Sequence, residues 1–220
     1  MKTVNPLEIF GSELCSVQNP SSYIGGEFGS IVKKHTDGDD MFNFGIAFPD
    51  VYDIGMSNQA IKIIYNGLNR IGTVRCERIF AVDKDFEELL KKHDVPQYTL
   101  ETGMPLNELD MIGFSIGYEL GITGVLSILD LGRIPLLKKD RGENDPIVIA
   151  GGCGATNPAP FSDFFDAVFS NDSYQITDTQ NFSLEVAKIE APVRDYWQRI
   201  LKNLPPIKGV PYSKQTSGNY

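Results

Sequence analysis

The stretch from Phe44 to Asn58, FGIAFPDVYDIGMSN, constrains the fold of this chain more than any other segment. Its apolar first half is typical of a buried strand. Pro49 is expected to end that strand in a loop, and a helix is predicted to follow at once. Buried strands followed by small or polar residues return at 110–115 and 146–152. Because the ends of parallel strands meet at one sheet edge, the three segments are predicted to converge on one ligand.

Apolar periodicity predicts the remaining elements. Helices are expected at 4–17, 58–71, 83–92, 120–131 and 161–165, and strands at 73–81, 97–100, 134–137, 147–150 and 167–169. Strands that alternate with helices favour right-handed crossovers and a parallel sheet. The sequence therefore predicts an α/β fold of the flavodoxin-like, or Rossmann-like, type. We expect a mostly parallel five-stranded sheet with helices on both faces.

Changes in composition divide the chain into three parts. Residues 1–40 are predicted to form an N-terminal extension, with a glycine-rich and aromatic segment at 22–29. Residues 41–170 are predicted to form the α/β domain. Residues 171–220 are predicted to form a C-terminal helical extension, with a helix at 181–204 that breaks at Pro192, and a loosely held tail.

Charge and hydropathy exclude several kinds of partner. The formal net charge of −9 argues against nucleic acid as a partner. There is no apolar run of the ~18 residues that a bilayer-spanning helix needs, so no membrane partner is expected. The N-terminal residues lack the apolar region of a secretory signal, and we expect a cytoplasmic protein.

The cysteines and histidines give no metal signature. Cys15, Cys76 and Cys153 lie far apart, so no iron–sulfur cluster is expected in this chain and free thiols are predicted. His35 and His93 lie in charged stretches and are expected to be solvated surface residues.

Two further patterns suggest other chemistry. Residues 113–117 match Gly-x-Ser-x-Gly, the nucleophile-elbow pattern of hydrolases, but neither histidine has the context of a triad base. Asp53 and Asp166 are candidates for acid–base or cation-binding roles, although loop aspartates are more often solvated turn formers, and that is what we expect of both.

Five segments taken together resemble a known family. They look like the N-terminal cobalamin-binding-like domain of a group of bacterial radical SAM proteins, over roughly residues 20–170. The segments are Ser22–Glu27, Phe48–Asn58, Cys76–Phe80, Ile112–Leu120 and Ala150–Pro158.

In that family the domain precedes a radical SAM barrel with a Cys-x-x-x-Cys-x-x-Cys motif. No such motif occurs in these 220 residues, and Ser170–Ser173 departs from the Gly-Glu-Gly-Glu seen in such proteins. The resemblance therefore implies the fold and a corrinoid site, but not the radical chemistry. By itself the chain is not expected to be an enzyme.

The resemblance also implies which residues bind the cofactor. Asp50, Tyr52 and Gly55 match an Asp-x-His-x-x-Gly loop of cobalamin-binding domains, with tyrosine in place of histidine. Ser115 matches a Ser-x-Leu segment imperfectly, and Gly151 with Gly152 matches a Gly-Gly turn. A phenol with a pKa near ~10 is a poor cobalt ligand, so cobalamin would bind without a protein histidine ligand, or not at all.

Two functions follow from these expectations. The first is a corrinoid-binding module that is accessory to a separate radical SAM subunit. The alternative is a degenerate scaffold or protein-interaction module, whose contacts would come from 181–220. For the first function, replacing Gly152 with valine is expected to block ligand binding.

Overall fold

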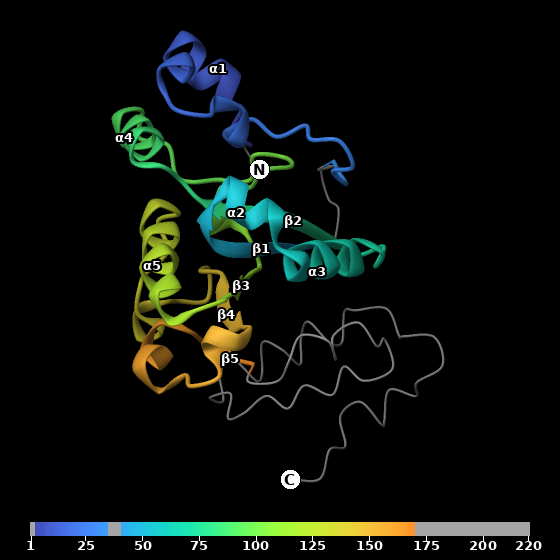
Figure 1. The fold of residues 1–220 in the computed structure, drawn as a ribbon, viewed down its shortest axis with the longest axis vertical. Helices are drawn as coiled ribbons and strands as arrows, with labels where there is room; N and C mark the ends of the chain where they lie inside the picture. Colours follow the sequence, from blue (N-terminus) through green and yellow to red (C-terminus); the bar gives the residue numbers. More distant parts are fainter. Residues whose placement is uncertain (1–2, 35–40, 170–220) are drawn as a thin grey trace.

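The structure is a computed structural model that describes residues 3–34 and 41–169. Its centre is a five-stranded sheet, parallel throughout, in the order β2-β1-β3-β4-β5 (Figure 1). The strands are Phe42–Val51 (β1), Val74–Ala81 (β2), Met111–Ser115 (β3), Ile147–Gly151 (β4) and Ala167–Val168 (β5). The predicted flavodoxin-like α/β fold is confirmed. The chain runs from β1 to a neighbour on one side and later returns to β3 on the other, which makes the gap between β1 and β3 the topological switch point.

Helices cover the two faces of the sheet and one end of it. They are Pro6–Phe10 (α1), Tyr52–Ser57 (α2), Gln59–Asn69 (α3), Lys84–Lys92 (α4) and Ile122–Leu131 (α5). In Figure 1, α3 and α5 lie on opposite sides of the sheet. Short 3-10 segments complete the described chain, at 11–16, 20–23, 106–108, 119–121, 138–140, 153–155 and 159–164.

Two apolar layers hold the sheet between its helices. Phe44 and Ile46 of β1 pack with Ile61 and Tyr65 of α3. On the opposite face, buried residues of α5 such as Val125 pack in a cluster with the central strands. Alternate residues of a strand point to opposite faces, so a central strand that is buried on both faces is apolar almost throughout.

β1 does not end at Pro49. The strand continues to Val51, and its register with β2 shifts between Phe48 and Val51. Proline has no N–H to donate to a sheet ladder, so a position at a register irregularity accommodates it inside a strand. The predicted loop is wrong, and α2 begins directly after the strand.

Two shorter predicted strands are also wrong. Residues 97–100 make only one isolated antiparallel bridge, between Tyr98 and Pro105. Residues 134–135 have no regular structure and residues 136–137 form a bend. Residues 97–100 and Ile134 are buried without forming a strand of the sheet, and periodicity does not distinguish that role from a strand.

The N-terminal segment packs on α4 to form a separate apolar cluster. The Tyr23 and Phe86 rings stack with centroids 3.8 Å apart, and Phe10 meets Phe86 edge-on at 5.6 Å. His93, at the end of α4, lies edge-on to Phe10 with its Nε2 3.3 Å from Glu13 Oε1. His93 is thus partly buried rather than fully solvated. His35 lies outside the described residues, as do the helix and tail predicted at 171–220.

Asp166 corrects another expectation. The Asp166 carboxylate accepts a hydrogen bond of 2.7 Å from the Val148 N–H and lies 3.3 Å from the Arg141 Nε. The two side chains are only 4% (Arg141) and 12% (Asp166) exposed, and burial raises the pKa of Asp166. The residue fastens the segment before β5 to β4, so its prediction as a solvated turn former is wrong. Asp53, by contrast, is exposed in the first turn of α2.

Asn58 caps α3, and this gives a stability prediction. The Asn58 Oδ1 accepts a hydrogen bond of 3.2 Å from the Ile61 N–H. We expect Asn58→Ala to lower the free energy of unfolding by about 1 kcal/mol, because an N–H of the first turn loses its partner. Urea unfolding would measure the change, with Asn66→Ala on the exposed side of the same helix as the control. Equal effects in the two variants would contradict the capping role.

Candidate functional site

The loops that follow β3 and β4 are joined by backbone hydrogen bonds at the carboxyl edge of the sheet. The Ile116 N–H donates to the Gly151 carbonyl at 2.8 Å, and the Gly154 N–H donates to the Ile116 carbonyl at 2.9 Å. Ser115 pairs in register with Gly151. The exposed Cys153 thiol donates to the Gly117 carbonyl at 3.0 Å. These contacts bring Ser115, Gly151 and Gly152 together, as their positions at strand ends predict.

Tyr118 connects this pair of loops to the end of β1. The Tyr118 hydroxyl donates a hydrogen bond of 3.0 Å to Asp50 Oδ2, and this bond raises the pKa of the phenol. Asp50 also accepts a 2.8 Å bond from the Val51 N–H, which orients its carboxylate. Sequence reasoning did not select Tyr118. Its place three residues after the end of β3 was the available signal.

The glycines of this edge differ in how much space a side chain would find at their positions. Gly152 has a φ of +99°, and a Cβ there would lie 2.5 Å from the Ile116 carbonyl oxygen. The protein's own backbone therefore occupies that space. A Cβ on Gly151 would make only ordinary contact, 3.7 Å from Phe169 Cβ, and a Cβ on Gly117 would meet nothing within 4 Å. Gly117 thus leaves open space beside the backbone after β3, whereas Gly151 at the end of β4 lies against Phe169.

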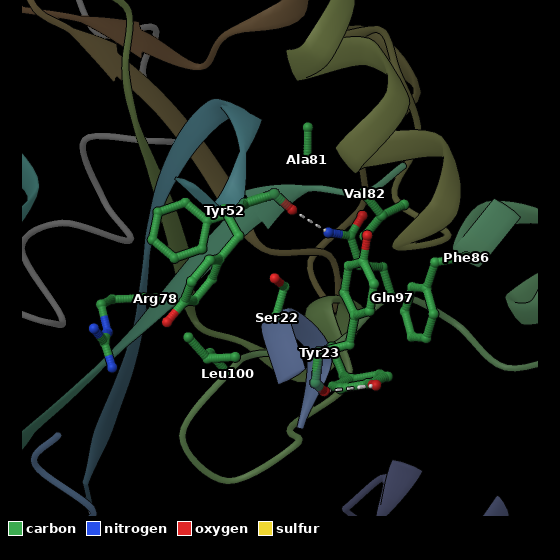
Figure 2. Close-up of a pocket in the computed structure, with 11 residues that line it drawn as sticks. Ser22, Tyr23, Tyr52, Arg78, Ala81, Val82, Phe86, Gln97 and Leu100 are labelled. Atoms are coloured by element: carbon green, nitrogen blue, oxygen red, sulfur yellow. Dashed lines mark hydrogen bonds between the residues drawn. The ribbon is translucent and has the colours of Figure 1, made fainter. Parts of the chain in front are cut away.

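Tyr52 and Gly55 face away from that group. The Tyr52 ring packs edge-on to Phe80 of β2, with centroids 5.7 Å apart. A Cβ on Gly55 would lie 2.2 Å from an atom of the Phe80 ring, so this glycine allows α2 to sit on β2. Figure 2 shows Tyr52 beside a small cavity of about 30 Å³ that Tyr23 of the N-terminal segment helps to line.

A buried charged cluster lies next to Tyr52. The Arg78 guanidinium contacts two carboxylates, with its Nε 2.5 Å from Glu101 Oε1 and an Nη 3.0 Å from Glu27 Oε2. It also lies 4.8 Å from the centre of the Tyr65 ring. Burial raises the pKa of Glu101 to about 7 and, together with Glu27, raises that of Tyr52. Tyr52 therefore stays a neutral phenol at neutral pH.

The side chains at this edge supply hydrogen-bonding groups, namely the Asp50 carboxylate and the Tyr118 hydroxyl. Within residues 3–34 and 41–169, no three histidine, cysteine or acidic residues form a group that would hold a metal ion. Ser115 ends β3 as the nucleophile-elbow pattern requires, but His93 contacts Phe10 and Glu13 instead of Ser115. In the same ranges, no helix has the length and apolar character to cross a bilayer.

The fold and this edge define an open α/β module of the kind that holds a ligand at the carboxyl ends of its strands. Residues 60–210 match the family model for the N-terminal region of radical SAM proteins. The match covers more than half of the chain, which therefore belongs to this family. Neither the curated proteins nor the solved structures gave a significant match.

Proposed function

We propose that this chain is a corrinoid-binding module that works beside a separate radical SAM subunit. The observation that carries the proposal is the switch point between β1 and β3, where Tyr118 bridges to Asp50 and Gly117 leaves space beside the backbone. A ligand there lies at the site where parallel sheets generally bind one. Membership of the radical SAM N-terminal family supports the choice of a corrinoid.

The residues of the edge suit a corrinoid in some respects. Ser115 and the Asp50–Tyr118 pair offer hydrogen-bonding groups to the amide side chains that surround a corrin ring. The open space beside the backbone at Gly117 lets a flat ring approach closely. Gly152 and Gly55 have a structural role instead. Gly152 allows the β4 loop to pack against the Ile116 carbonyl, and Gly55 allows α2 to pack against Phe80.

The residue at the position of the expected cobalt ligand does not suit that role. Tyr52, which stands where related loops have histidine, packs on Phe80 and has a raised phenol pKa. A neutral phenol is a poor donor to cobalt. We therefore propose that a corrinoid binds through its periphery, without an axial ligand from Tyr52.

The test is a titration of the purified chain with hydroxocobalamin. We expect co-elution with a visible absorbance spectrum, which is unchanged in Tyr52→Phe because that side chain is not a cobalt ligand. Gly117→Leu should weaken binding by about tenfold or more, because the leucine side chain would occupy the open space beside the backbone where the ligand is proposed to lie. Gly67→Leu is the matched control, because Gly67 is exposed on α3 and its Cβ would also meet nothing within 4 Å. A folded protein that stays colourless would overturn the proposal.

A second candidate is a scaffold that contacts other proteins and binds no cofactor. The exposed apolar side chains of Ile24, Phe28 and Val32 favour it, because Phe28 is fully exposed and its neighbours are at least 40% exposed. Under this hypothesis, Phe28→Ser lowers association with a partner while the melting temperature stays constant. If hydroxocobalamin binds and Gly117→Leu weakens that binding, the corrinoid-binding module is favoured over the scaffold.

A further inference from the structure

A larger cavity, of about 250 Å³, lies between α5 and the 3-10 segment Ala159–Phe164. Its walls are apolar and come from Ile122 and Leu126 on α5 and from Phe161 and Phe164 on the 3-10 segment. Glu119 and Asn157, from the loops after β3 and β4, complete the lining on the side that opens to solvent. A mostly apolar cavity with a few polar groups is the usual form of a small-molecule site.

The walls of this cavity are held by the core. Phe161 is 5% exposed and belongs to the main apolar cluster, and Ile122 and Phe164 pack against that cluster. The position of α5 is also fixed, because a Cβ on Gly124 would lie 2.2 Å from the Pro49 carbonyl oxygen. This contact fixes how closely α5 approaches the end of β1, and so it holds the α5 wall of the cavity in place relative to the sheet.

The two polar side chains of the lining, Glu119 and Asn157, are exposed to solvent. Neither Glu119 nor Asn157 makes a side-chain hydrogen bond or ion pair in the part of the chain that the structure describes. A carboxylate only accepts hydrogen bonds, so a ligand that pairs with Glu119 in place of water must bring a donor. The net charge of −9 further disfavours anionic ligands.

We propose that this cavity binds a small, mostly apolar molecule that carries an N–H donor at one end. The apolar body lies between the α5 side chains and the two phenylalanines, and the N–H donates to the Glu119 carboxylate. Two kinds of molecule share this chemistry, namely a flat nitrogen heterocycle and a primary amine with an apolar body. The proposal rests on the cavity alone and does not require that a corrinoid binds at the sheet edge.

The test compares three probes of similar size by ligand-observed NMR and by thermal shift. Benzimidazole is the flat heterocycle, benzylamine is the amine, and toluene lacks the donor. We expect one or both N–H probes to bind at least about fivefold more tightly than toluene, because only they can pair with Glu119. Whichever N–H probe binds more tightly identifies the kind of ligand. If toluene bound as tightly as the N–H probes, Glu119 would not contribute to binding and the proposed ligand class would be wrong. If no probe bound, the whole proposal would be overturned.

Two variants locate the binding. Leu126→Phe fills the cavity and should abolish binding of every probe, whereas Ile63→Phe on the exposed face of α3 should not. Glu119→Gln removes the charge and should weaken benzylamine by at least about fivefold relative to toluene, and Glu88→Gln is its exposed control. The Glu119 variant keeps the test decisive if Leu126→Phe fails to fold. If the probes bound equally well to both variants and to the unchanged protein, this cavity would not be their binding site. That result would not depend on whether hydroxocobalamin binds at the sheet edge.

Discussion

Replacing Gly152 with valine is expected to destabilise the domain strongly, whether or not a ligand binds at the sheet edge. Gly152 has φ +99° and ψ 173°, a region that only glycine adopts readily. Forcing another residue into it costs roughly 1–3 kcal/mol. The new Cβ would also lie 2.5 Å from the Ile116 carbonyl oxygen, and overpacking of this kind adds a further ~1–3 kcal/mol.

The control for this variant is its neighbour. A Cβ on Gly151 meets Phe169 Cβ at 3.7 Å, an ordinary contact, so Gly151→Ala should melt close to the wild-type temperature. Thermal unfolding followed by circular dichroism would measure both variants. If Gly152→Val melted like Gly151→Ala, the contact between the β3 and β4 loops would not constrain the edge as the structure indicates. Because Gly152→Val is expected to destabilise the fold, loss of ligand binding in that variant would not locate the site, and Gly117 is the better position to test.

Replacing Arg78 with methionine is expected to have the largest effect on stability. Arg78 contacts Glu101 and Glu27, and the Glu101 side chain is fully buried. Without the guanidinium, Glu101 is a buried carboxylate without its ion-pair partner, and removal of one member of a buried pair costs about 3–5 kcal/mol. Arg133→Met is the control, because the Arg133–Asp94 pair is 47% and 91% exposed and should contribute little.

The effect of this substitution should depend on pH. Burial already raises the pKa of Glu101 to about 7, above its ordinary value of 4.5, so the folded protein binds a proton that the unfolded chain releases. This group therefore favours folding below about pH 4.5, and its contribution is lost as the pH rises through 7. Loss of Arg78 removes a charge that lowers the pKa of Glu101, so the pKa should rise further. The variant should then be relatively more stable at pH 5.5 than at pH 8.

Denaturant unfolding at the two pH values measures this difference. Adding Glu101→Gln to the Arg78→Met protein should recover part of the lost stability at pH 8 and little at pH 5.5, because a neutral amide resembles the protonated acid. A destabilisation by Arg78→Met that is the same at both pH values would show that packing, and not the carboxylate, is responsible.

Local patterns were sufficient to predict most of the sheet and its helices. The apolar spacing of Ile61, Tyr65 and Leu68 gave α3 its expected place, and the β-branched run at 147–150 predicted β4. Alternation of strand and helix then predicted a parallel sheet, whose connections put the ends of β1, β3 and β4 at one edge. These inferences hold because strand and helix periods are properties of neighbouring residues.

The tertiary structure alone decided how the residues at that edge are used. It turned Tyr52 towards Phe80, filled the space beside Gly152 with the Ile116 carbonyl, and paired Asp50 with Tyr118, which lies 68 positions away. It also buried Asp166 against Arg141. The sequence by itself determined which segments form the central strands and the main helices, because periodicity is local. Which side chains meet beyond the ends of the strands depends on contacts between distant segments, and those exist only once the core has packed.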